Sequence, residues 1–226
     1  MVNLTDTLIE KAKILGKTIV LPETEDVRVI QAAELIVKEG IAKLILVGNL
    51  AKIRDDAKVN SVNIDGVEII DPKTYERTEE FVIELQKLRE KKGMTIEQAR
   101  EIMLTDPRFF GAMLVRMGLA DGMVAGSNSP TAQVLKAAIQ VIGVKPGLKT
   151  VSSSFIMITK TPEYGYNGVF VFSDGGVIPD PTAEQMADIA ISASEKAKFT
   201  AGILEPKVAF LSFSTKGSAE HPMVTK

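Results

Sequence analysis

The feature that most constrains the fold of this chain is a repeated alternation of short apolar runs with longer amphipathic segments. Four runs rich in Val, Ile or Leu are bounded by Gly, Pro or Asp, at residues 17–22, 43–48, 67–71 and 122–126. Runs of this kind are typical of strands buried on both faces of a parallel sheet. The repeated strand-then-helix pattern therefore predicts a doubly wound α/β domain with a mostly parallel sheet.

Terminal signals place the helices between these runs. Residues 26–40 carry apolar side chains at helical spacing and end at a glycine, which suits the position after a helix. A long helix is predicted over residues 75–92, and the next begins at Thr95, where Gln98 completes a capping box. We also expect Asp26 to cap the helix that follows the first strand.

The pattern changes in the last third of the chain. Residues 151–159 and 168–175 are two strand-like runs whose connection is too short for a crossover helix, so they are predicted to pair antiparallel. A helix is predicted from Thr182 to Phe199, and a final strand over residues 208–213.

Pro146 and Gly147 mark a boundary between two domains. We therefore divide the chain into a first α/β domain, residues 1–148, and a second α/β domain, residues 149–226. The second has too few elements to cover a sheet, so we expect it to be incomplete. Its remaining elements would come from residues beyond Lys226 or from another chain.

The composition excludes several kinds of partner and chemistry. In 226 residues, 27 basic and 29 acidic side chains give a net charge of −2, which leaves no electrostatic footprint for nucleic acid. The absence of cysteine excludes disulfides, thiolate zinc sites and a cysteine nucleophile from this chain. Because no apolar run approaches the roughly 18 residues of a membrane helix, we expect a cytoplasmic protein with no membrane partner.

One candidate anion site lies where the fourth strand-like run ends at Gly126. Ser127, Asn128 and Ser129 form a polar turn, and Pro130 is predicted at the first position of the next helix. The free N–H groups of that helix start would face an anion such as a phosphate or carboxylate. The alternative is structural: Ser129 or Asn128 simply caps the helix.

A second candidate follows the predicted final strand. Ser214, Thr215 and Ser218 offer hydroxyls, Lys216 offers a positive charge, and Gly217 permits a left-handed backbone in which N–H groups converge. The stretch lacks the full spacing of a P-loop, and an ordinary polar loop is the alternative.

Three other features were weighed as sites. The acidic residues 23–26 follow the first strand, at the end of the sheet where α/β proteins hold ligands. Arg89 lies among the cations at a helix end, which usually serve the helix dipole. His221, the only histidine, has no neighbouring carboxylate run and is a poor candidate for a general base.

Several stretches occur in the order and at the spacing of a known family: KTIVLPETEDVRVIQAAELIVKEGIAKLILVGN, IIDPKTYE, LREKKGMT, ADGMVAGS, SSSFIMI and VAFLSFSTKGSA. Over essentially its whole length the chain resembles the phosphate acetyltransferases, or phosphotransacetylases. The resemblance implies homodimers with a substrate cleft between two α/β domains. It also implies reversible acetyl transfer between coenzyme A and phosphate. Coenzyme A, acetyl-CoA and acetyl phosphate would be substrates, with no metal and no permanently bound cofactor.

The resemblance also suggests roles for individual residues. Arg89 matches a substrate-binding arginine of the family, and Lys136 stands where the family usually has a second one. Lysine there offers a point charge in place of a planar bidentate fork. The turn from Ser127 to Thr131 and the loop from Ser214 to Ser218 match family segments and would hold the acyl phosphate.

Family members continue past the Ser214–Ser218 loop, and their catalytic aspartate, serine and a further arginine lie in that continuation. The chain thus resembles an N-terminal portion of the family, and we expect no acetyl transfer from these 226 residues alone. Phosphate butyryltransferase is an alternative within the same chemistry. A non-catalytic acyl-CoA-sensing module is an alternative of another class. A dehydrogenase is disfavoured because no G-x-G-x-x-G motif follows a predicted strand.

Overall fold

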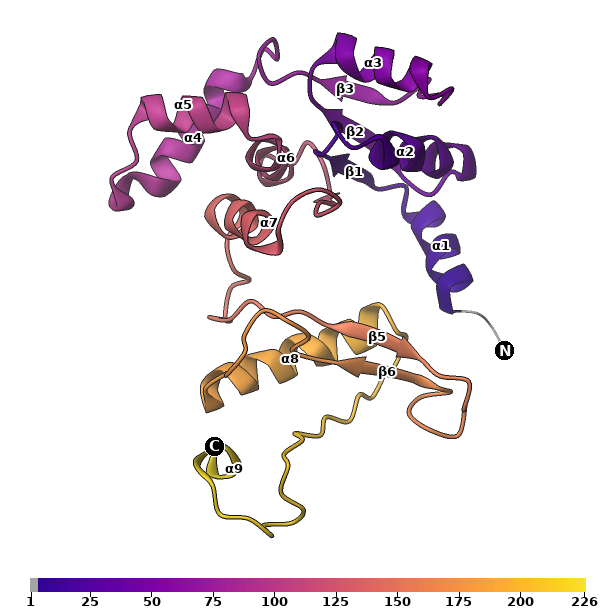
Figure 1. The fold of residues 1–226 in the computed structure, drawn as a ribbon, viewed down its shortest axis with the longest axis vertical. Helices are drawn as coiled ribbons and strands as arrows, with labels where there is room; N and C mark the ends of the chain where they lie inside the picture. The colour runs from indigo at the N-terminus through magenta and orange to yellow at the C-terminus, as the bar shows by residue number, and fades with distance from the viewer. Residues whose placement is uncertain (1–3) are drawn as a thin grey trace. The chain divides into compact units, whose positions relative to one another are not determined.

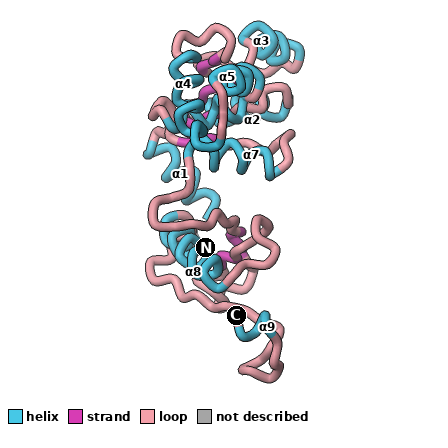
Figure 2. Tube along the Cα trace, turned by 90° about the vertical axis from the view of Figure 1, so that its left-hand side faces the viewer, coloured by secondary structure: helices cyan, strands magenta, loops and turns pink. Residues whose placement is uncertain are grey.

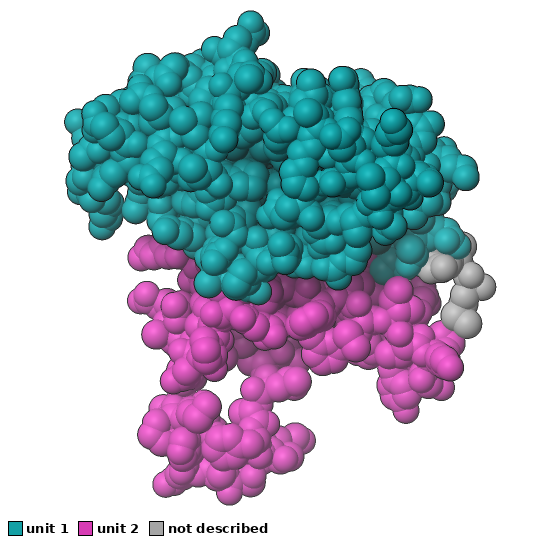
Figure 3. Space-filling view, turned by 45° about the horizontal axis from the view of Figure 1, so that its top comes forward, with its two compact units in different colours: residues 1–143 teal, residues 144–226 magenta. Residues whose placement is uncertain are grey.

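The computed structural model describes residues 4–226, and the chain divides into two compact units, Met1–Gly143 and Val144–Lys226 (Figure 3). The first unit contains a parallel four-stranded sheet in the order β3-β2-β1-β4. Its strands are β1 (Thr18–Leu21), β2 (Lys43–Val47), β3 (Glu68–Ile70) and β4 (Gly122–Met123). The four apolar runs therefore form the predicted parallel sheet. β1 is central, with β2 on one side and β4 on the other.

A helix precedes the first strand of the first unit, and helices follow each of its strands (Figure 1). They are α1 (Leu4–Leu15), α2 (Val27–Glu39), α3 (Leu50–Val59), α4 (Thr78–Arg89), α5 (Ile96–Thr105), α6 (Pro107–Arg116) and α7 (Thr131–Ala137). A short 3₁₀ turn, Glu90–Lys92, extends α4, and a π-helical turn, Ala138–Ile142, extends α7. Asp26 caps α2, and Thr95 with Gln98 forms a capping box at α5, so both predicted helix starts are confirmed.

The core of the first unit lies on both faces of the sheet because neighbouring strand residues point to opposite sides. Val20 packs into a cluster with α4, α5 and α6, whereas Leu21 packs into a smaller cluster with α2 and α3. Three aromatic rings of the larger cluster, those of Tyr75, Phe81 and Phe110, pack against one another. Phe81 lies 5.2 Å from Phe110 and 5.7 Å from Tyr75, measured between ring centroids.

The second unit is built on an antiparallel hairpin, as predicted. β5 (Phe155–Ile158) pairs with β6 (Val169–Phe172), with Phe155 opposite Phe172. The helix α8 (Ala183–Phe199) contacts β6 and starts at a capping box formed by Thr182 and Gln185. A short terminal helix, α9 (Pro222–Thr225), follows.

The predicted final strand, residues 208–213, is wrong. This stretch is loop, and Figure 2 shows loop throughout the connection between α8 and α9. A strand needs a partner for its backbone groups, and the sheet of this unit consists of β5 and β6 only. Large apolar side chains of the unit consequently stay exposed, among them Phe155, Phe172, Phe210 and Phe213.

The aromatic cluster supplies a test of the core. Phe81 is fully buried on α4, whereas Ile83 on the same helix is 59% exposed. We expect Phe81→Ala to lower the free energy of unfolding by about 3–5 kcal/mol, because a cavity opens between Tyr75 and Phe110. Ile83→Ala should change it by about 0.5 kcal/mol or less. Urea unfolding followed by circular dichroism measures both, and equal losses would contradict this description of the core.

Candidate functional site

The candidate site lies at the carboxyl ends of β1 and β4, which are neighbours in the sheet although about a hundred residues separate them. β2 and β3 are added to the sheet on one side of β1, and β4 is added on the opposite side, so the strand order reverses at β1. Loops that follow strands on either side of such a reversal are where open α/β sheets bind ligands. Here these loops are residues 22–26 and 124–130.

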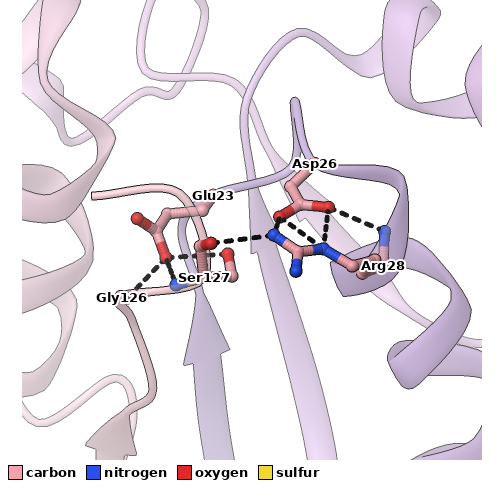
Figure 4. A network of polar contacts seen from close by, with 5 residues as sticks. All are labelled: Glu23, Asp26, Arg28, Gly126 and Ser127. Atoms are coloured by element: carbon pink, nitrogen blue, oxygen red, sulfur yellow. Dashed lines mark hydrogen bonds and ion pairs between the residues drawn. The ribbon is translucent and has the colours of Figure 1, made fainter. Parts of the chain in front are cut away.

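The two loops are joined through the side chain of Glu23, which is only 1% exposed. Its Oε2 atom accepts a hydrogen bond from the N–H of Gly126 at 2.5 Å and from the N–H of Ser127 at 2.8 Å. The hydroxyl of Ser127 donates to the same oxygen at 3.0 Å (Figure 4). The other carboxylate oxygen, Oε1, is buried and has no hydrogen-bond partner among the described residues.

This environment acts on the pKa of Glu23 in two opposite directions. Burial raises the pKa, since it removes the carboxylate from water. Interactions with Ser129, Gly126 and Ser127 lower it, and together they bring the pKa from its ordinary 4.5 to about 2. Glu23 is therefore negatively charged at neutral pH, although water barely reaches it.

Arg28 holds the same loop from the first turn of α2. Its Nη2 atom donates to the backbone carbonyl of Ser127 at 2.9 Å and to Asp26 at 2.6 Å (Figure 4). The side-chain hydrogen bonds from Arg28 lower the pKa of Asp26, which also caps α2. Arg28 is thus oriented by its own helix cap toward the loop.

Arg108 repeats this arrangement at the start of α6. Asp106 caps α6 and accepts a hydrogen bond from Nε of Arg108 at 2.8 Å. The Nη1 atom of Arg108 donates to the hydroxyl of Ser129 at 2.8 Å and to the side chain of Gln133. An Asp-x-Arg sequence therefore begins both α2 and α6. This repeated motif is the sequence signal that identifies the two arginines, neither of which is among the predicted site residues.

The start of α7 differs from both predictions made for it. Pro130 lies at the N-cap position rather than at the first helical position, and no side chain caps the helix. Ser129 does not serve as the cap, because its hydroxyl accepts from Arg108. The N–H groups of Gly126 and Ser127 donate to Glu23, so an internal carboxylate already occupies part of the predicted anion-binding turn.

The other predicted residues of the first unit lie outside this network. Asn128, Thr131 and Lys136 are exposed, and Lys136 forms no ion pair with residues 4–226. Arg89 is half-buried at the last position of α4. The role of each as a substrate ligand stays a prediction.

The loop Ser214–Ser218 belongs to the second unit and closes on itself. The hydroxyl of Ser218 accepts from the N–H of Thr215 at 3.1 Å, and the hydroxyl of Ser214 accepts from the N–H of Ala219 at 3.0 Å. Lys216 and Gly217 both have positive φ angles, of 49° and 77°. The side chains of Thr215, Lys216 and Ser218 face solvent, so they remain available for a ligand.

An apolar cavity of about 450 Å³ opens beside the Glu23 network in the first unit. Glu23, Arg28 and Ser127 line it, together with aliphatic side chains from the sheet and α2, such as Leu21, Val29, Ile36 and Leu44. Within residues 4–226, His, Asp and Glu side chains form no group of three or more suited to a metal ion. Over the same range, no helix combines the length and apolar character that a membrane span requires.

An α/β fold with loops converging at a strand-order reversal is the architecture of many small-molecule enzymes. Comparison with known proteins narrows this class. The sequence model described as "Phosphate acetyl/butaryl transferase" matches residues 3–226, and the chain belongs to this family.

Named relatives and solved structures agree with the family assignment. The phosphate acetyltransferase of Acetivibrio thermocellus is 46% identical over 221 residues, which are 98% of this chain and 65% of the relative. That of Thermoanaerobacterium thermosaccharolyticum is 45% identical over 224 residues, 99% of this chain and 67% of the relative. A phosphotransacetylase structure from Streptococcus pyogenes superposes with a TM-score of 0.89 at 36% identity, covering 98% of this chain and 65% of that chain. The EutD phosphotransacetylase from Staphylococcus aureus gives 0.85 at 36% identity, covering 99% and 64%. The chain thus spans about two thirds of the length of these proteins.

The depressed pKa of Glu23 predicts a specific pH dependence of stability. A carboxylate with a lowered folded-state pKa stabilises the fold above its unfolded pKa, here 4.5, and loses this contribution as the pH falls toward about 2. Wild-type protein should therefore be more stable than Glu23→Gln at neutral pH, and the difference should shrink below about pH 4.5. Urea unfolding between about pH 7 and pH 3 measures this. A difference that stays constant over that range would show that the charge of Glu23 is not involved.

Proposed function

We propose that the protein acts in the reversible transfer of an acetyl group between coenzyme A and inorganic phosphate. The observation that carries this proposal is the match of nearly the whole chain, at 45–46% identity, to relatives named phosphate acetyltransferase. In the direction of acetyl-CoA formation, the thiolate sulfur of coenzyme A bonds to the carbonyl carbon of acetyl phosphate. The bond from that carbon to the phosphate oxygen breaks, and phosphate leaves with the electron pair.

Residues of this chain would bind and orient the substrates. Arg89 and the exposed Lys136 would contact phosphate groups, and the turn Ser127–Thr131 and the loop Ser214–Ser218 would hold the acyl phosphate. Holding two reactants in line accounts for much of the acceleration of such a reaction. The sulfur nucleophile would be the thiol of the substrate coenzyme A.

The proposal extends to partners and location. Coenzyme A, acetyl phosphate and phosphate would be substrates, with no permanently bound cofactor, and the protein would be a cytoplasmic homodimer. The exposed aromatic side chains of the second unit, such as Phe155 and Phe210, support association with further protein surface.

The complete gene product tests the proposed function directly. We expect acetyl-CoA formation from acetyl phosphate and coenzyme A, measured by absorbance of the thioester, and the reverse reaction in the presence of arsenate. Faster turnover of butyryl-CoA than of acetyl-CoA would favour phosphate butyryltransferase. Binding of acetyl-CoA without turnover would favour a sensing module and would overturn the proposed transfer activity.

Lys136 provides a residue-level test. We expect Lys136→Ala to raise KM for acetyl phosphate about 10- to 100-fold, because a charge-assisted hydrogen bond of about 1.5–3 kcal/mol is lost. Lys136→Arg should bind acetyl phosphate equally well or better. Lys58→Ala, which removes an exposed lysine from α3, is the matched control. An unchanged KM in Lys136→Ala would remove Lys136 from the site.

A further inference from the structure

Glu23 is a buried carboxylate that has no role in the proposed transfer reaction. It follows β1 directly, and solvent reaches 1% of its surface. Burial of a carboxylate is costly unless donors compensate the charge, and each buried polar group usually has a reason to be retained. Here three donors from one short segment converge on a single oxygen.

The donors all belong to the segment Gly126–Ser129, which the proposed function places against substrate. Gly126 has a φ angle of 111°, a backbone conformation that side chains with a Cβ rarely adopt, and its N–H donates to Glu23. Ser127 contributes both its N–H and its hydroxyl. The local backbone is therefore held in an unusual conformation by a charge that lies outside the segment.

Two cations complete the hold on this segment. Arg28 donates a hydrogen bond to the carbonyl of Ser127, and Arg108 donates one to the hydroxyl of Ser129. The carboxylate of Glu23 thus accepts hydrogen bonds from two N–H groups of the segment, while the guanidinium of Arg28 donates to the carbonyl of Ser127 in the same segment (Figure 4). The negative charge of Glu23 lies at N–H groups of the segment and the positive charge of Arg28 lies at a carbonyl oxygen, so the two charges together favour one orientation of its peptide groups. Of the three anchors, Glu23 is the one that is almost completely buried, so it is the least free to move.

The second carboxylate oxygen indicates that burial alone does not explain Glu23. Oε1 is buried without a partner among residues 4–226, which costs free energy that a residue selected only for stability would avoid. The negative charge at Oε2 is what the segment uses.

We propose that Glu23 is a positioning residue of the transfer site, which acts by holding the Gly126–Ser129 segment in the conformation that presents Ser127–Thr131 to acetyl phosphate. This role rests on the proposed function. Glu23 does not contact the reacting atoms in this role, and its effect passes through the backbone of the segment it holds.

Glu23→Gln in the complete gene product tests the role. The amide oxygen of glutamine still accepts from the segment, but the charge is lost and the NH₂ group cannot accept. We expect the amides of Gly126 and Ser127 to exchange with solvent at least about tenfold faster, with α2 and α5 unchanged. We expect kcat/KM for acetyl phosphate to fall about 10- to 100-fold, with KM for coenzyme A within about twofold of wild type.

Glu39→Gln is the matched control, because Glu39 is exposed at the last position of α2, outside the loops that form the site. It should leave both amide exchange and kinetics at wild-type values. The wild-type protein supplies a measurement that needs no folded variant: Gly126 and Ser127 should exchange more slowly than the exposed neighbour Asn128. Equal exchange at all three amides would overturn the role, as would Glu23→Gln behaving like Glu39→Gln.

The outcomes separate this inference from the proposed function. Protected amides in a wild-type protein that transfers no acetyl group would overturn the proposed function and leave Glu23 as the anchor of the segment. An active enzyme whose loop is indifferent to Glu23→Gln would overturn the positioning role alone.

Discussion

The rest of the site depends on one buried interaction, the ionised carboxylate of Glu23 with the N–H groups that follow β4. It joins segments 103 residues apart in the chain, at the point where the strand order reverses. The two-residue pairing of β4 with β1 is too short to orient the loop that leaves it. The carboxylate of Glu23 compensates for this short pairing. Its three hydrogen bonds to Gly126 and Ser127 fix the position and direction of the backbone that follows β4.

Features that depend on local sequence were predictable. Apolar runs bounded by turn residues identified the parallel strands, and the caps at Asp26 and Thr95 were recognisable because a cap involves residues only two or three apart. The hairpin β5–β6 was predictable for the same reason, since its connection is too short for a crossover.

Features that depend on distant partners were not predictable in this way. Residues 208–213 have the composition of a strand but form loop, because strand formation is decided by a neighbour and not by the segment itself. Ser129 looked like a helix cap, yet Arg108, 21 residues earlier, engages its hydroxyl. The hydrogen bond between Gly126 and Glu23 likewise joins residues that are 103 positions apart in the sequence. Only the position of Glu23 after a strand hinted at it.

The repeated Asp-x-Arg starts of α2 and α6 have a consequence for the charge that an arriving anion meets. Each arginine is neutralised by the aspartate of its own helix cap, so the pairs Asp26–Arg28 and Asp106–Arg108 orient the loop without adding net charge to it. Glu23 and Glu25 then leave the two loops with an excess of two negative charges, and Lys136 is the charged residue of α7 that partly offsets them. Attraction of a phosphate over distances beyond contact would therefore come from exposed cations such as Lys136, and dissolved salt would screen it. The arginines, in contrast, act at short range, where ionic strength has little effect.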